Sequence, residues 1–209
     1  MVLEYVPLNI SQALASLDQD DRAKTMTHIS SALEYLHPQG ITHRDVKPDN
    51  VLVVYDAGRR EQAVFRLADF GTSKHNASEM METFTGTSRY IAPELFKMPL
   101  RYTNKVDMWS LGMVGMRLFS SWNPQSDREW NGIDFGHWVR NLILPLMEKG
   151  VPEPLRPLLK GLLLKTPHKQ MVRLGLHTLS LGDFVCGGCR FRGRKRRSQQ
   201  GVASIGAGR

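Results

Sequence analysis

Four polar residues near the middle of the chain have side chains that could serve a chemical reaction. Asp45, Lys47 and Asn50 lie within six residues, and Asp69 follows after two short apolar runs. Carboxylate and amide oxygens are hard ligands of the kind that Mg²⁺ prefers in proteins. A carboxylate held in place can also accept a proton from a substrate. These residues predict an active site that uses magnesium, provided that the fold brings Asn50 and Asp69 together.

Hydrophobic spacing predicts two helices around this polar cluster. One covers residues 20–37, with Asp20 or Asp21 as its N-cap and residues 38–40 (PQG) as its stop. The other covers residues 104–119, and short helices interrupted by prolines follow it. The first helix ends a few residues before the cluster, so its end fixes where the cluster begins.

Strand patterns occur at the start of the chain and between the two helices. Residues 1–6 alternate apolar and polar side chains before Pro7, as at the end of a strand. The runs 51–55 and 64–70 flank a turn-rich segment and predict a β-hairpin, whereas residues 72–90 are typical of a loop. A hairpin brings the residue before its first strand beside those at the end of its second.

Four short motifs follow one another along these elements. They are 43–50 (HRDVKPDN), 69–71 (DFG), 86–94 (GTSRYIAPE) and 107–112 (DMWSLG). In this order they resemble the catalytic loop, the two ends of the activation segment and the anchoring helix of eukaryotic-type serine/threonine protein kinases. The resemblance covers about residues 1–170. It implies an α+β fold, namely a protein-kinase-like carboxy-terminal lobe that is mostly helical with a small β-hairpin.

The resemblance also implies a reaction, the transfer of the γ-phosphate of ATP to serine or threonine of protein substrates, with Mg²⁺ as the metal. It makes Asp45 the residue that orients the substrate hydroxyl and accepts its proton, and Lys47 the cation beside the γ-phosphate. Asn50 and Asp69 become the Mg²⁺ ligands. Lys47 further favours serine or threonine as the acceptor, because tyrosine kinases of the family usually carry an Ala/Arg-containing run at this place.

Nucleotide contacts are implied in the same way. Glu4 and Val6 resemble the hinge whose backbone binds adenine, and Leu3 stands at the gatekeeper position before it. Leu52 matches the residue that forms the floor under adenine, and Asp69 completes the nucleotide site through its metal.

Other motif residues have a functional and a structural interpretation. His43 and Phe70 resemble two members of the apolar column of an active kinase, and they are equally typical of core side chains. Asp107 either receives backbone amides of the catalytic loop, as in the family, or is an ordinary acidic residue at a helix N-terminus. A second DFG at 134–136 follows the APE element, so it predicts a surface turn.

Three threonines lie in the segment that regulates many members of the family. Thr83 occupies the place of the activating phosphate, and Arg44 is the matching cation beside the catalytic aspartate. Thr85 is the nearest alternative, and Thr87 is expected to belong to the substrate platform. An upstream activating kinase is therefore an expected partner.

The sequence departs from the family's pattern at both ends. It has no Gly-rich loop, no lysine on a third strand and no glutamate partner, all of which would precede Met1. The expectation is a partial kinase domain over residues 1–170 that is inactive by itself; the alternative is a non-catalytic kinase-like binding module. Gln170 also stands where the family places an arginine that pairs with Glu94.

The net charge of +8 is unevenly distributed. Residues 190–209 hold seven Arg and Lys and no acidic residue, which leaves 21 basic and 20 acidic residues in the rest of the chain. The Gly/Arg-rich segment 171–209 is a nuclear-localisation or RNA-binding tail, a disordered tail, or an artefact of gene prediction. Cys186 and Cys189 are at most half a zinc site. Nucleic acid is an expected partner only through this segment.

Composition limits the remaining classes of protein. An apolar fraction of 41% is typical of one globular domain with a core. No apolar run reaches the roughly 18 residues of a membrane span, and the start lacks the pattern of a secretory signal. Two cysteines cannot form a disulfide framework. The expected location is cytoplasmic or nuclear, without a membrane partner.

Overall fold

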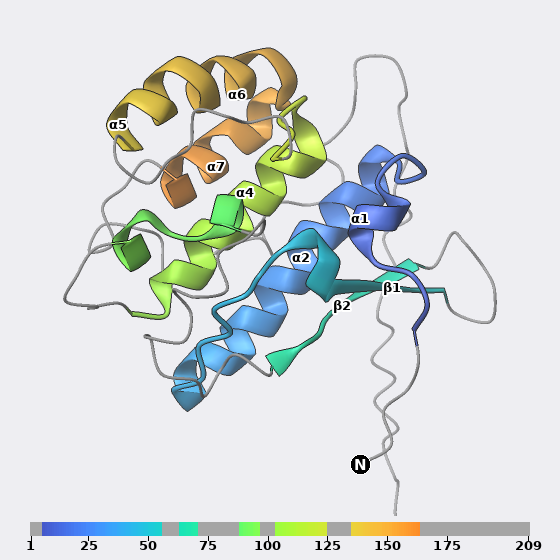
Figure 1. The fold of residues 1–209 in the computed structure, drawn as a ribbon. Coiled ribbons are helices and arrows are strands. Elements are labelled where there is room, and N and C mark those ends of the chain that lie inside the picture. Colours follow the sequence, from blue (N-terminus) through green and yellow to red (C-terminus); the bar gives the residue numbers. More distant parts are fainter. Residues whose placement is uncertain (1–5, 56–62, 71–87, 97–102, 125–134, 164–209) are drawn as a thin grey trace, which may run out of the picture.

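The structure is a computed structural model that describes residues 6–55, 63–70, 88–96, 103–124 and 135–163 (Figure 1). Its elements are α1 (Ile10–Ala13), α2 (Gln19–Leu36), η1 (His37–Gln39), η2 (Pro48–Asn50), β1 (Val51–Tyr55), β2 (Ala63–Leu67), η6 (Ser88–Tyr90), η7 (Pro93–Phe96), α4 (Lys105–Phe119), α5 (Phe135–Trp138), η8 (Val139–Ile143), α6 (Leu144–Gly150), η9 (Glu153–Leu155) and α7 (Arg156–Leu163). The described part is mostly helical with one two-stranded antiparallel sheet. This confirms the predicted helices and hairpin.

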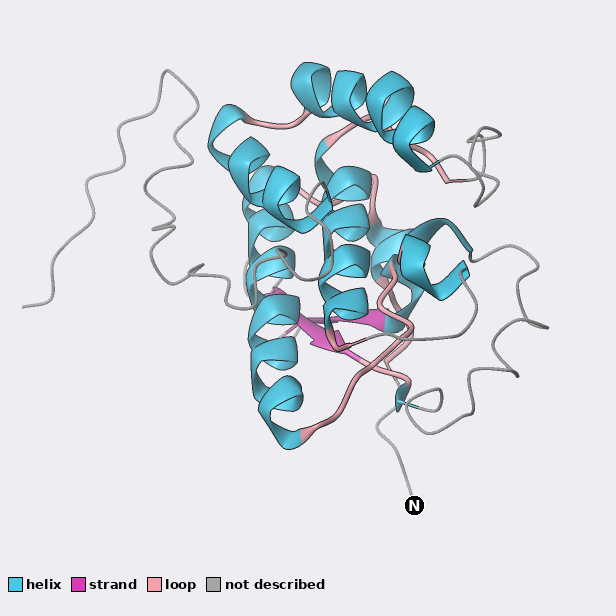
Figure 2. Cartoon of the chain, turned by 90° about the vertical axis from the view of Figure 1, so that its left-hand side faces the viewer, coloured by secondary structure: helices cyan, strands magenta, loops and turns pink. Residues whose placement is uncertain are grey.

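Two long helices form the centre of the fold. α2 and α4 pack against each other, β2 lies across α2, and α7 packs on α4. The strands therefore lie at one end of the molecule, and α5, α6 and α7 lie at the other (Figures 1 and 2). Among the described residues, no helix is both long and apolar enough to cross a membrane.

The N-cap of α2 lies two or three residues before the two predicted N-caps. Its N-cap is Asp18, whose side chain accepts a hydrogen bond from the Asp21 backbone N–H at 2.8 Å. The prediction of Asp20 or Asp21 as N-cap was wrong, because both lie in the first turn, where acidic side chains favour the positive end of the helix dipole. The predicted stop is confirmed, since Gly40 adopts φ 74° directly after η1.

The hairpin pairs Val51 with Leu67 at one end and Tyr55 with Ala63 at the other. Alternate side chains, among them Val53 and Phe65, are buried, as expected for a sheet with one covered face. β2 ends at Leu67 rather than at the predicted residue 70. Asp69 has φ 62°, a left-handed conformation that cannot continue a strand.

The free edge of β1 pairs with a segment just before α1. The Val53 N–H donates to the Leu8 carbonyl at 2.8 Å, and Asn9 forms a bridge with Leu52. The strand predicted at 1–6 lies almost wholly outside the described residues, and Val6 is not in a strand. α1 follows at once and was not predicted, although its Asn9–Gln12 capping box is a signal in the sequence.

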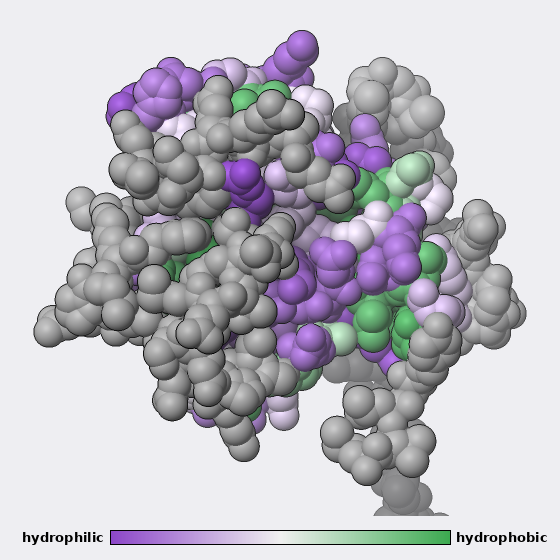
Figure 3. Space-filling model, in the orientation of Figure 1, coloured by the Kyte–Doolittle hydropathy of each residue, from purple (hydrophilic) through white to green (hydrophobic). Residues whose placement is uncertain are grey.

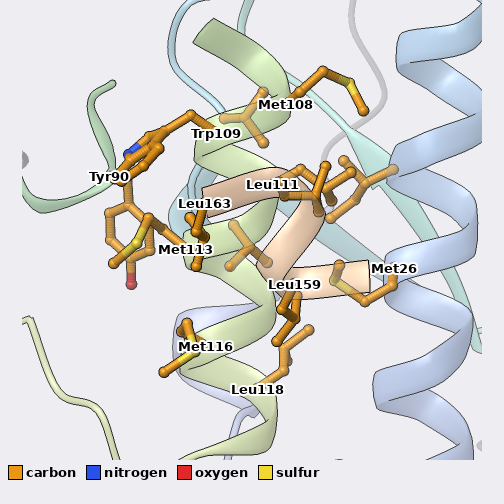
Figure 4. Close-up of a cluster of buried hydrophobic side chains, with 14 of the residues drawn as sticks. Met26, Tyr90, Met108, Trp109, Leu111, Met113, Met116, Leu118, Leu159 and Leu163 are labelled. Atoms are coloured by element: carbon orange, nitrogen blue, oxygen red, sulfur yellow. The ribbon is translucent and has the colours of Figure 1, made fainter. Parts of the chain in front are cut away.

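The core is built around α4, whose residues are buried on every side from Val106 to Met116. Met26 of α2 and Leu159 of α7 reach into the same cluster (Figure 4). A helix surrounded in this way needs small residues where its neighbours come closest. Gly115 meets this need, because a Cβ built there would lie 2.5 Å from Leu159 Cδ2 and 3.2 Å from Met26 Cε.

We predict that Gly115→Ala destabilises the fold, although alanine is the better helix former. The helix would gain about 0.5 to 1 kcal/mol, whereas overpacking a filled core costs about 1 to 3 kcal/mol. The expected net loss in the free energy of unfolding is about 1 kcal/mol, measured by urea denaturation. In a Leu159→Ala background the same substitution should become neutral or stabilising. Additive effects of the two substitutions would contradict this explanation.

Candidate active site

The predicted catalytic loop is held by one buried carboxylate. Asp107, in the first turn of α4, is fully buried, and its Oδ1 accepts a hydrogen bond from the Arg44 N–H at 2.7 Å. Its Oδ2 accepts from the His43 N–H at 2.9 Å and lies 2.9 Å from His37 Nε2. Arg44 has φ 69°, the left-handed region that non-glycine residues rarely adopt. The carboxylate thus fixes the first residues of the loop in a strained turn.

His43 connects this loop to the end of β2. Its ring is fully buried, with Nε2 3.0 Å from the Ala68 carbonyl and Nδ1 accepting from the Asp45 N–H at 3.3 Å. These partners place the ring hydrogen on Nε2. The ring also packs against Phe70, with centroids 5.0 Å apart. His43 and Phe70, which were predicted to share an apolar column, are therefore in contact. Phe70 is 44% exposed, whereas His43 is buried.

Three of the predicted site residues meet at one carboxylate. Lys47 Nζ lies 2.8 Å from Asp45 Oδ2. The Asn50 amide nitrogen donates to the same oxygen and to the Asp45 carbonyl, both at 2.8 Å. The Asp45 and Lys47 side chains are about one-fifth exposed, so the group is fixed within the protein and still reachable from solvent. This arrangement can hold a carboxylate for proton transfer with a cation beside it.

The hairpin brings Asn50 and Asp69 to the same end of the sheet. The Ala68 N–H donates to the Asn50 carbonyl at 2.9 Å, which continues the ladder beyond the paired strands. Asp69 is the next residue. Because the Asn50 amide nitrogen is directed at Asp45, its Oδ1 is the atom that remains for a ligand. An amide oxygen and a carboxylate suit Mg²⁺, which takes few protein ligands and fills its shell with water and phosphate oxygens.

Other metal arrangements do not appear in the part of the chain that the structure describes. No group of three or more His, Cys, Asp or Glu residues there could hold a metal ion. The Asn50 and Asp69 pair, which the sequence predicts as Mg²⁺ ligands, is a smaller, two-oxygen set, and its metal binding stays a prediction.

The end of the predicted activation segment is fastened to α4. Ser110 Oγ lies 2.8 Å from the Tyr90 carbonyl and 3.0 Å from the Val106 carbonyl. The Tyr90 ring packs edge-on against Trp122 with centroids 5.6 Å apart, and burial raises the pKa of its phenol well above the usual range. The same helix therefore supports both the catalytic loop and this segment.

The remaining predicted residues fall into two groups. Val6 and Leu52 are half-buried, and Leu52 lies on β1 opposite Arg66. The others lie outside the described residues, and what was expected of them stays a prediction: Leu3, Glu4, Thr83, Thr85, Thr87, Asp134, Gln170, Cys186 and Cys189. Sequence analysis missed His37, the third partner of Asp107, since its position at a helix stop indicated only the stop.

We predict that Asp107→Asn loosens the catalytic loop. An amide nitrogen would face at least one of the three donors, so a hydrogen bond to a charged group worth about 1.5 to 3 kcal/mol is lost. The free energy of unfolding should fall by about that amount in urea denaturation. The matched control is Asp20→Asn, which breaks the exposed 2.6 Å pair with Lys24 and should change stability by less than about 1 kcal/mol. Equal effects of the two substitutions would contradict the anchoring role.

The family model and the curated relatives that match this chain are protein kinases. A family model described as "Protein kinase domain" matches residues 1–179. Serine/threonine-protein kinase cds1 of Schizosaccharomyces pombe is 32% identical over 172 residues, which cover 77% of this chain and 34% of the relative. Ovarian-specific serine/threonine-protein kinase Lok of Drosophila melanogaster is 40% identical over 134 residues, covering 61% and 28%. Serine/threonine-protein kinase SCH9 of Saccharomyces cerevisiae is 35% identical over 159 residues, covering 73% and 18%.

The chain thus spans about a third or less of the length of these curated relatives. Members of the matched family generally use ATP and Mg²⁺. The match covers every element described above, from α1 to α7, together with the loop that Asp107 anchors. This chain belongs to the protein kinase family.

Proposed function

We propose that these residues are part of a catalytically competent protein serine/threonine kinase, which transfers the γ-phosphate of ATP to serine or threonine hydroxyls of protein substrates. The observation that carries the proposal is the meeting of Lys47 and Asn50 at Asp45 Oδ2, with both contacts at 2.8 Å. A binding module without activity has no need for a carboxylate held in this way. The names of the relatives, which are serine/threonine kinases, support the proposed acceptor.

In the proposed mechanism Asp45 orients the substrate hydroxyl and takes its proton as the oxygen attacks phosphorus. The Asp45 carboxylate does not have to be ordered during the reaction, because the Asn50 amide holds its Oδ2 and the His43 ring accepts a hydrogen bond from the Asp45 backbone N–H. Lys47 lies beside Asp45. Its positive charge would stabilise the negative charge on a phosphoryl group bound there. General-base help of this kind contributes about 10²- to 10⁴-fold.

Asn50 and Asp69 would hold Mg²⁺ against the triphosphate. The ion would supply charge neutralisation on the phosphate oxygens. The contribution of the chain is to orient the two ligands: the Asn50 amide is turned by Asp45, and Asp69 is directed by its left-handed backbone. Both residues lie at the same end of the hairpin, where the Ala68 N–H donates to the Asn50 carbonyl.

The outer face of the hairpin is the proposed floor of the nucleotide site. Leu52 and Val54 are half-buried and Val64 is 39% exposed, and hydrophobic atoms gather around α1 and the strands (Figure 3). Apolar surface of this kind suits adenine. We propose that Glu4 and Val6 form the hinge edge of this site. On this proposal residues 1–170 form the hinge and carboxy-terminal lobe, and the family match extends nine residues further, to residue 179.

The proposal predicts the loss of phosphate transfer without loss of the fold. In a longer form of the protein that includes the nucleotide-covering lobe, Asp45→Asn should lower kcat by about 10²- to 10⁴-fold, and Asp69→Asn should lower it at least as far. Radiolabelled ATP and a protein substrate give the measurement, and the urea midpoint checks folding. Asp20→Asn is the control and should keep its activity. Activity of either variant within tenfold of the wild type would refute the assigned role.

A second prediction concerns regulation by Thr83. A phosphate there would make about one to three charge-assisted hydrogen bonds, with Arg44 as a proposed partner, and would order the segment. We expect peptide mapping of the active protein to find phosphothreonine at this position, and Thr83→Ala to lower activity at least about tenfold. Thr85→Ala is the matched control. An unmodified Thr83 in fully active protein would contradict the prediction.

A further inference from the structure

The outer edge of β2 carries a backbone donor that β1 cannot satisfy. Val53 is paired with Phe65, but the Val53 N–H points away from β2 and donates to the Leu8 carbonyl. In an antiparallel ladder, a residue whose N–H points outward belongs to a non-hydrogen-bonded pair, and its partner points outward as well. The Phe65 N–H therefore faces the open edge of the hairpin.

One side chain of α2 covers this edge. His28 Nδ1 accepts a hydrogen bond from the Phe65 N–H at 3.1 Å, and the two rings are tilted with centroids 6.0 Å apart. Met26 contacts α4, whereas His28, two residues later, faces β2, so α2 is bound on two sides. An imidazole nitrogen accepts a hydrogen bond only while it carries no proton.

The strand that His28 covers leads directly into the candidate site. Three residues separate Phe65 from Asp69, and one of them, Ala68, binds both Asn50 and His43. β2 is held on one side by the ladder to β1 and on the other by the contact to His28. Because the segment between Phe65 and Asp69 is short, a displacement of β2 at this edge would also displace Asp69, the proposed metal ligand.

We propose that His28 is a positioning residue, which holds β2 and through it Asp69 in place only while its imidazole is neutral. Only the consequence for Asp69 rests on the proposed kinase function, because the contact between the helix and the strand is present regardless of any reaction.

The surroundings of His28 favour the neutral ring. Burial, and to a smaller extent the charge of Lys24 one turn earlier, lower its pKa from the usual 6.5. On β2 the charged residue is Arg66, which alternates with Phe65 and lies on the opposite, exposed face. On α4, Lys105, Asp107 and Arg117 belong to the helix that contacts the other side of α2, and the Asp107 carboxylate is occupied by the catalytic loop.

The sign of the pH effect follows from this direction. A ring with a lowered pKa in the folded state binds protons more readily in the unfolded state. The contact is therefore fully present above the unfolded pKa, near 6.5, and its contribution falls as the pH drops below that value. At still lower pH the protonated ring would direct an N–H at the Phe65 N–H and open the edge.

The test is amide hydrogen exchange at Phe65 in the purified 209-residue chain between pH 7.5 and 5, corrected for intrinsic rates. We expect protection of this amide to fall below pH 6.5 with the slope of one proton, up to about tenfold per pH unit. The Asp69 amide chemical shift should change with protonation of the folded ring, which occurs below pH 6.5. His28→Gln keeps an acceptor that does not titrate, so its Phe65 protection should be independent of pH. His137→Gln, at an exposed histidine of α5, is the matched control and should behave like the wild type.

Two results would overturn the proposal: Phe65 protection in the wild type that does not vary over this range, or the same pH dependence in His28→Gln. If the variant fails to fold, the wild type still decides, because Phe65 protection must fall over the pH range between 6.5 and the NMR titration midpoint of the His28 ring. None of these readouts needs activity, so failure of Asp45→Asn and Asp69→Asn to lower phosphate transfer in the longer form would reject the kinase mechanism and leave this inference standing.

Discussion

The buried carboxylate of Asp107 is the interaction on which the other parts of the site depend. A carboxylate removed from water is tolerated only when its oxygens are hydrogen-bonded, and here the partners are two backbone amides of the catalytic loop and the His37 ring. Burial of Asp107 in α4 requires these amides, and the same bonds hold the strained residue Arg44 in its left-handed conformation. Folding of the core and formation of the site are therefore one event.

The described part of the site is held together by short contacts between backbone and side chains. His43 joins the loop to the end of β2, Asn50 joins the loop to β1, and Asp69 follows both. Two residues with left-handed backbones, Arg44 and Asp69, are held at these junctions. Strain of this kind persists only where surrounding contacts outweigh it, and the fully buried His43 ring between the two residues supplies such contacts.

α2 serves the core and the site with different faces. Its buried apolar residues pack on α4, while His28 closes the edge of β2 that would otherwise expose an unpaired N–H. The same helix ends at His37, which contacts Asp107. One amphipathic helix therefore connects the central carboxylate with β2, the strand that precedes Asp69.

The sequence predicted the elements and the family: apolar spacing predicted α2 and α4, alternation predicted the hairpin, and four motifs predicted the protein kinase family. The roles of Asp45, Lys47, Asn50 and Asp69 come from the same motifs and stay predictions. Local patterns carry this information because they depend on periodicity and side-chain type. Packing of distant segments decided that Leu8 pairs with β1, and that His37 and His28 contact Asp107 and Phe65. Such contacts join residues 37 to 70 positions apart, and hydrogen-bond partners at that separation are set by packing, which no local pattern encodes.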